Sequence, residues 1–174
     1  MSLSVCLLLD EAADRAVRRL WSRLEDDGVP TLQTHTHGRH VPHLSLASLL
    51  SYDVHEVRAA LEALPPASPT VLHFDALGLF RRSRCWLVPG LTSGFLSRQE
   101  GVVSALDRTG AQLHRHYRPG EWLPHLTLAP RLHLDQLPTV ARRAYEVLPL
   151  TATVSAAALV ETATGTVHEL GHLV

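Results

Sequence analysis

The spacing of apolar residues along the chain predicts a mixture of strands and helices. Leu3–Leu9 is apolar at almost every position, which is typical of a strand buried on both faces in the middle of a sheet. After Asp10, a residue type suited to begin a helix, apolar side chains recur at helical spacing until Gly28. The helix is expected to bury Val17, Leu20, Trp21 and Leu24.

The remainder of the chain continues to mix the two kinds of element. Strands are predicted at residues 41–50, 70–80, 84–89, 123–129, 150–163 and 166–174, helices at 53–64, 93–113 and 134–148, and a polar loop at 31–40. This order predicts an α+β fold. Because the second half repeats the element order of the first, we expect two pseudo-symmetric lobes. Each would be an antiparallel or mixed β-sheet with two flanking helices, and a central cleft would lie between the lobes.

The chain of 174 residues suits a single domain made of these two lobes. The lobes are expected at roughly residues 30–90 and 91–174. The strand at 3–9 and the helix at 10–27 would then join the two sheets.

A duplicated segment carries the candidate chemistry. The decapeptides at residues 41–50 and 123–132 are identical at six of ten positions, and each contains Pro-His-Leu followed by Ser or Thr. Side chains alternate between the faces of a strand, so His43 shares a face with Ser45, and His125 shares one with Thr127. The leucines between them can enter the core. Core packing alone would not keep both the imidazole and the hydroxyl in register.

Two imidazoles with two hydroxyls suit the chemistry of phosphodiesters. An unperturbed imidazole titrates near pH ~6.5, so at neutral pH one ring can accept a proton from water while the other donates one to a leaving oxygen. Ser45 and Thr127 can donate hydrogen bonds to the non-bridging phosphate oxygens. No metal or cofactor is required. The near symmetry of the two motifs leaves open which histidine is the acid and which is the base.

Composition excludes several other mechanisms. All 16 residues counted as lysine or arginine are arginine, which excludes adenylylation of lysine, a Schiff base and a phosphate-binding P-loop lysine. The net charge of −1 indicates that any RNA is bound at a local site. Cys6 and Cys85 lie in apolar runs and are expected to be buried free thiols.

The tetrads His43–Leu46 and His125–Leu128 resemble the signature of the two-histidine (2H) phosphoesterase superfamily, and within it the bacterial 2′-5′ RNA ligase / RNA 2′,3′-cyclic phosphodiesterase family. The resemblance extends over essentially the whole chain. It implies opening of a 2′,3′-cyclic phosphate to a 2′-phosphate, and in some members reversible ATP-independent 2′-5′ ligation. The implied partners are RNA ends with a cyclic phosphate, or small cyclic nucleotides such as ADP-ribose cyclic phosphate.

Further substrate contacts are predicted near the second motif. Some members of the family carry an arginine soon after the second tetrad, and Arg131 is the nearest candidate here. Tyr117 or Trp122 could stack on a base, and Arg118 could meet a phosphate. No aromatic residue directly follows the first tetrad.

Two alternative functions stay open from the sequence. One is a nucleotide- or RNA-binding module that keeps the fold without turnover. The other is a metal-binding protein that uses His35, His37 and His40, although a loop at the edge of the site is the simpler interpretation. The turn with Arg81, Arg82 and Arg84 could guide RNA or could be a solvated hairpin tip.

The N-terminal apolar run is short and lacks a basic segment before it, so it predicts a strand and no signal peptide. No stretch approaches the ~20 apolar residues that span a bilayer. We therefore expect a cytoplasmic protein, without membrane partners, that acts as a monomer.

Overall fold

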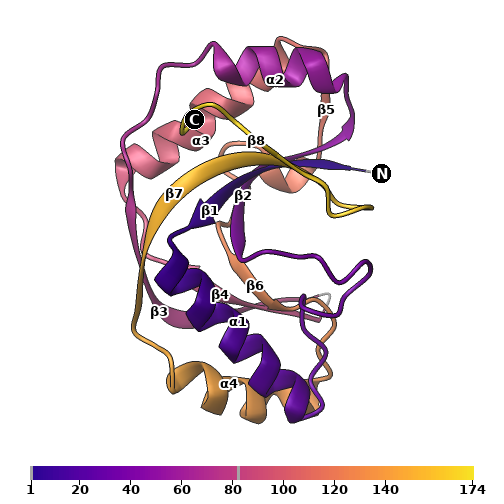
Figure 1. Ribbon diagram of the computed structural model, residues 1–174, viewed down its shortest axis with the longest axis vertical. Helices are drawn as coiled ribbons and strands as arrows, with labels where there is room; N and C mark the ends of the chain where they lie inside the picture. The colour runs from indigo at the N-terminus through magenta and orange to yellow at the C-terminus, as the bar shows by residue number, and fades with distance from the viewer. Residues whose placement is uncertain (1, 82) are drawn as a thin grey trace.

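The computed structural model describes residues 2–81 and 83–174, and its centre is one eight-stranded antiparallel sheet (Figure 1). The strand order is β5-β2-β1-β7-β3-β4-β6, and β8 pairs with β7. The strands are β1 (Leu3–Leu9), β2 (His43–Ser51), β3 (Val71–Phe80), β4 (Arg84–Pro89), β5 (Gln112–Leu113), β6 (Leu126–Ala129), β7 (Leu150–Glu161) and β8 (Val167–Glu169). The α+β class and the central position of β1, which pairs with β2 and β7, are confirmed.

The prediction of a separate sheet in each lobe is wrong, because β7 connects both ends of the sheet. Leu150–Thr153 pairs with β3, and Val154–Glu161 pairs with β1. Strand pairs also cross the expected division near residue 90, since β2 pairs with β5 and β4 pairs with β6. Each end of the sheet is therefore built from both halves of the chain. A strand of 12 residues is long enough to pair with different partners along its two ends.

Two helices cover each end of the sheet, as expected (Figure 1). In the described part of the chain the α-helices are α1 (Glu11–Asp26), α2 (Val54–Glu62), α3 (Ser93–Asp107) and α4 (Leu137–Tyr145), with 3₁₀ turns η1 (Arg115–Tyr117) and η2 (Leu134–Gln136). Helix α1 packs on α4, and α2 packs on α3. Each helix turns a stripe of apolar side chains to the sheet.

Some predicted boundaries differ from the structure. The helix expected at 93–113 ends at Asp107, because Gly110 has a positive φ of 70° and turns the chain into the short edge strand β5. Helix α4 is also shorter than the predicted 134–148, because Leu134–Gln136 form the 3₁₀ helix η2 and the α-helix ends at Tyr145. The final strand β8 covers only Val167–Glu169 of the predicted 166–174.

Asp10 joins helix α1 to the point where β7 changes partner. Its carboxylate accepts hydrogen bonds from the backbone N–H of Ala13, at 3.0 Å, and of Thr153, at 2.5 Å. The Asp10 N–H in turn donates to the Thr153 carbonyl at 2.8 Å. The first acceptor bond caps the helix. The two bonds to Thr153 fix the last β7 residue before Val154, and Val154 is the first residue of β7 to pair with β1.

Gly78 permits a close approach between β3 and β4. Gly78 lies opposite Trp86 across the strand pair. A Cβ atom at position 78 would lie 2.4 Å from Cζ2 of the Trp86 indole, far inside van der Waals contact. The indole therefore rests on the glycine backbone.

Apolar side chains fill a core on the helix-covered face, and a smaller cluster containing Cys6, Ala158 and Val160 lies apart from it. Cys6 and Cys85 are both free and buried, as predicted. Among the residues described, no helix combines the length and apolar character needed to span a membrane.

We expect Gly78→Ala to lower the free energy of unfolding by about 1–3 kcal/mol, because the indole or the strand must shift to admit the methyl group. Urea unfolding measures this change. Gly101→Ala is the matched control, since no atom lies within 4 Å of the new Cβ on helix α3 and alanine favours helix. Equal behaviour of the two variants would contradict this packing.

Asp10→Ala should destabilise more than Asp53→Ala, which removes only the N-cap of α2. The Asp53 variant should lose about 1 kcal/mol, and the Asp10 variant about 2–3 kcal/mol, because Thr153 N–H also loses its acceptor. Chemical unfolding of both variants at neutral pH tests the difference. Losses of equal size would show that the Thr153 contact adds nothing.

The Asp10 contact also predicts a dependence of stability on pH. The Thr153 N–H, ahead of the Ala13 N–H, lowers the pKa of Asp10. The stabilisation is therefore present above the pKa of the unfolded chain and is lost as pH falls through the lower folded value. Asp10→Asn should flatten this acid loss in unfolding curves between about pH 5 and 2.

Candidate active site

The two histidine motifs begin strands that lie near opposite ends of the strand order and do not pair with each other. His43 is the first residue of β2, and His125 directly precedes β6. Strands β2 and β6 nevertheless come into contact, where the lower end of β2 lies above β6 in Figure 1. The leucines of both motifs are buried in the core, as the alternation predicts, so the histidines and hydroxyls occupy the other face.

Both imidazoles are held in the same orientation. His43 Nδ1 lies 2.7 Å from the Val41 carbonyl, and His125 Nδ1 lies 2.7 Å from the Leu123 carbonyl. A carbonyl oxygen only accepts, so each Nδ1 carries the hydrogen and donates it. Each Nε2 is then the atom that can gain or release a proton.

Cys6 is a neighbour of the first motif that the sequence did not identify. It lies opposite Ser45 in the β1–β2 pair, and its Sγ is 3.6 Å from Ser45 Oγ. Burial lowers the pKa of His43, but interaction and hydrogen bonding with the Cys6 sulfur, helped by the Val41 carbonyl, outweigh it and raise the pKa to about 9. His43 is thus favoured as the cation at neutral pH.

His125 is shifted in the opposite direction. Burial is the main cause that lowers its pKa, and the Leu123 carbonyl opposes it only in part. The positive charges of His43 and Arg84 lower the pKa of His125 further. His125 is therefore favoured as the neutral imidazole. The surroundings of two similar motifs therefore shift the pKa values of their histidines in opposite directions.

Tyr117 belongs to the site through Ser45. Its hydroxyl lies close enough to the Ser45 side chain for that side chain to act on it, and burial raises the pKa of Tyr117 to about 12, so the phenol stays neutral. Gln99 of α3 supports this turn from the core, because its Nε2 donates to the Tyr117 carbonyl at 2.7 Å and to the Leu46 carbonyl at 3.2 Å. The sequence indicated Tyr117 as a base-stacking residue and did not indicate Gln99.

A tryptophan indole anchors each motif strand. Trp122 Nε1 donates to the Ser45 carbonyl at 3.1 Å, and Trp21 Nε1 donates to the Thr127 carbonyl at 3.3 Å. Trp122 is only 8% exposed and stacks on Phe95. The prediction that Trp122 stacks on a base is therefore not supported, because its ring lies inside the protein and its N–H is already used.

Aromatic rings surround the second motif. Phe80 and Trp86 stack with ring centroids 4.9 Å apart. The His125 ring meets both of them edge-on, with its centroid 5.0 Å from Phe80 and 5.6 Å from Trp86. The sequence placed both residues on strands but gave neither a role, because their closeness to His125 depends on the pairing of β4 with β6.

Among the predicted arginines, Arg84 acts on the site most directly, since its charge lowers the pKa of both His125 and Tyr117. Arg131 is exposed, and its positive charge helps to lower the pKa of His35. Arg118 is exposed, and its backbone carbonyl accepts a hydrogen bond from the backbone N–H of Trp122 at 3.1 Å. This bond shapes the turn before the second motif. Arg81 is exposed, and Arg82 lies outside the described residues.

The loop with His35, His37 and His40 borders His43. The ring centroids of His37 and His40 are 4.2 Å apart. Burial, followed by the charges of His37, His43 and His35, lowers the pKa of His40 to about 4. In the described chain no three histidine, cysteine or acidic side chains are arranged to hold a metal ion. The loop is therefore an edge of the site, and the metal-binding alternative gains no support.

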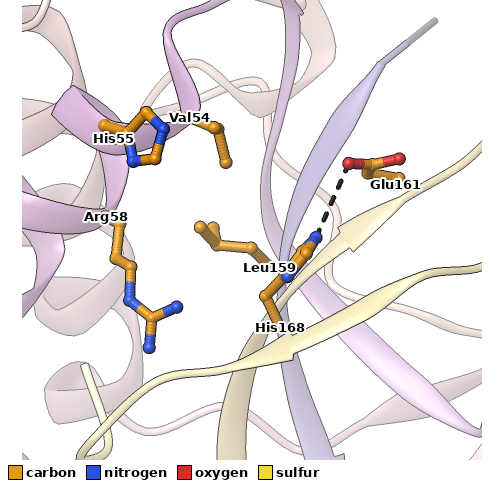
Figure 2. Close-up of a pocket in the computed structure, with 6 residues that line it drawn as sticks. All are labelled: Val54, His55, Arg58, Leu159, Glu161 and His168. Carbon is orange, nitrogen blue, oxygen red and sulfur yellow. Dashed lines mark ion pairs between the residues drawn. The ribbon is translucent and has the colours of Figure 1, made fainter.

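A hollow away from the motifs is lined by Val54, His55, Arg58, Leu159, Glu161 and His168 (Figure 2). His168 Nε2 lies 3.5 Å from Glu161 Oε1. Leu159 follows Ala158, which pairs with Cys6, so the hollow opens on the sheet face opposite to Ser45. It takes no part in the site.

The chain resembles known proteins in both sequence and fold. The sequence model of the 2′-5′ RNA ligase superfamily matches residues 9–166. No curated protein matches the sequence. The structure of E. coli LigT complexed with 3′-AMP superposes with a TM-score of 0.63 at 16% identity, over 96% of this chain and 92% of that chain.

Other solved structures share the fold with similarly low sequence identity. E. coli LigT complexed with NADP+ gives a TM-score of 0.61 at 17% identity, over 96% of this chain and 91% of that one. Usb1 of Kluyveromyces marxianus gives 0.52 at 13% identity, over 97% of both chains. The family match includes both histidine motifs and most of the sequence, and the chain therefore belongs to the 2′-5′ RNA ligase superfamily of two-histidine phosphoesterases.

Proposed function

We propose that this protein is a metal-independent cyclic phosphodiesterase that opens a 2′,3′-cyclic phosphate, on an RNA end or a nucleotide, to a 2′-phosphate. The observation that carries the proposal is the pair of histidines whose Nδ1 atoms are both held by backbone carbonyls and whose pKa values are shifted in opposite directions. Oppositely shifted neighbours are how a site keeps an acid and a base ready at one pH. The substrate would lie in a cleft between two pseudo-symmetric lobes, with one motif on each side.

The opposite pKa shifts of the two histidines support the following roles. His125, neutral, takes a proton from water at Nε2 while the water oxygen attacks phosphorus. The bond from phosphorus to O3′ breaks, and His43, the cation, gives its Nε2 proton to O3′. The P–O2′ bond stays, so the product is a 2′-phosphate. Return of the proton from His125 to His43 through solvent resets the site.

The hydroxyls and one arginine stabilise the charge that builds on the phosphate. Ser45 and Thr127 donate to the non-bridging oxygens, and the neutral phenol of Tyr117 lies beside Ser45. Arg84 supplies a positive charge next to His125. Such preorganised donors are effective because they need no reorganisation during the reaction.

The ligands of the related structures are consistent with this substrate class. LigT was solved with 3′-AMP and with NADP+. Each of these ligands carries a phosphate on a secondary ribose hydroxyl, as the proposed product does. Reversal of the same step, with a 5′-hydroxyl of RNA in place of water, would give ATP-independent 2′-5′ ligation.

Incubation with nucleoside 2′,3′-cyclic phosphates should yield only the 2′-monophosphate, with or without EDTA, as followed by phosphorus NMR. His43→Ala and His125→Ala should each lower kcat by about 10²–10⁴-fold, because each removes one partner in proton transfer. His55→Ala, in the hollow of Figure 2, is the matched control and should keep full activity. If the protein binds the cyclic nucleotide but does not turn it over, the enzyme interpretation is wrong and the protein is a nucleotide-binding module.

The activity should follow a bell-shaped pH profile. It should fall on the acid side as His125 is protonated, below the ordinary histidine value, and on the alkaline side near pH 9 as His43 loses its proton. Cys6→Ala should move the alkaline limb to lower pH, because the thiol no longer raises the pKa of His43. NMR titration of the histidine ring protons measures both pKa values directly.

Cys85→Ala is the matched control for Cys6→Ala. Cys85 is also a free, buried cysteine, but it lies on β4 next to Ala129 in the strand register. Its replacement should leave both limbs in place. An alkaline limb that stays unchanged in Cys6→Ala would show that Cys6 does not set the protonation of His43.

A further inference from the structure

Side chains from three strands meet on one sheet face around the second motif. Phe80 lies opposite Arg84 in the β3–β4 pair, and Trp86 lies opposite Thr127 in the β4–β6 pair. Opposed residues, and residues two apart on one strand, share a face of the sheet. Phe80, Arg84, Trp86 and Thr127 are therefore neighbours on the face that also carries His125.

The two aromatic rings form a continuous surface beside the reacting imidazole. Phe80 is half-buried and stacks on Trp86 with an interplanar angle of 28°. Trp86 is 8% exposed and rests on Gly78, so it cannot move away from Phe80 into the sheet. The exposed part of the surface thus belongs to Phe80, with Trp86 as rigid support.

This aromatic surface has features that packing alone does not explain. The Trp86 indole N–H is buried without a hydrogen-bond partner, in contrast to the indoles of Trp21 and Trp122. An unpaired buried donor is costly and uncommon. Phe80 is only partly covered beside His125, so its ring can take a further contact from a ligand.

The charge next to the rings selects the kind of ligand. Arg84 is exposed at its strand end, yet its charge acts on His125, Tyr117 and His35. An aromatic face for a planar ring together with a guanidinium for a phosphate is the combination that binds nucleotides. No acidic side chain of the described chain shifts the pKa of His125, so the surroundings favour an anionic ligand.

We propose that Phe80, supported by Trp86, is a stacking site for the base of the nucleoside whose cyclic phosphate is opened. The inference rests on the proposed function and names the substrate class more closely as nucleosides that carry a base. Stacking uses the π-face that every base has, so the site should accept all four bases and discriminate against cyclic phosphates without a base.

The test compares adenosine 2′,3′-cyclic phosphate with the base-free 1-O-methylribose 2,3-cyclic phosphate. Wild-type protein should show a kcat/KM about ten- to hundredfold higher for the nucleoside, which is the range expected for one stacked base. Phe80→Ala should bring the ratio of kcat/KM for the two compounds close to one, whatever the loss of the ring beside His125 does to the turnover of both. A circular dichroism spectrum and an unfolding curve show that the variant is folded. Phe80→Tyr should restore the preference.

Leu79→Ala is the matched control, because Leu79 precedes Phe80 on β3, points to the other face and is 46% exposed. It should keep the preference for the nucleoside. Equal kcat/KM values for the two compounds in wild type, or a preference that survives in Phe80→Ala, would overturn the stacking site.

Failure of the proposed function would look different, because wild type would turn over neither compound. Calorimetric titration with adenosine 2′-monophosphate and with base-free ribose 2-phosphate then decides the inference. Wild-type binding of the nucleotide that weakens about tenfold or more in Phe80→Ala supports the stacking site without the reaction. No binding, or equal binding by both proteins, rejects it.

Discussion

The change of partner along β7 is the constraint on which the rest of the structure depends. At Thr153 the strand stops pairing with β3, and at Val154 it begins to pair with β1. Asp10 holds this junction, because its carboxylate binds the Thr153 N–H and caps helix α1. One carboxylate therefore couples a helix start to the continuity of the sheet. That continuity adds to the direct contact between β2 and β6, which carry the two motifs.

The site is symmetric in its backbone and asymmetric in its surroundings. Both histidines donate from Nδ1 to the carbonyl two residues before them. One ring then meets a cysteine and the other meets two aromatic rings. Duplication accounts for the shared frame. The neighbours that differ divide the acid and base roles, because a sulfur partner favours a cation and an apolar setting favours a neutral imidazole.

The neighbours of the motif strands show how a small site is held in place. The indoles of Trp21 and Trp122 fix the carbonyls of Thr127 and Ser45, so the hydroxyl on each motif stays aimed at the same region. Gln99 of α3 fixes the turn that brings Tyr117 to Ser45. Supporting contacts of this kind limit the movement of catalytic groups, which is what differential stabilisation of a transition state requires.

The sequence by itself determined the elements, the α+β class and the two motifs, because strand alternation and the duplicated decapeptide are local signals. It also placed the leucines inward and the histidines outward. Only the tertiary structure decided that one sheet joins both halves, that Trp122 anchors a strand, and that Cys6 and Phe80 lie beside the histidines. Cys6 and Ser45 are 39 residues apart, and Trp122 and Ser45 are 77 apart. Contacts at such separations depend on which strands pair, and the pattern of apolar residues does not specify a partner.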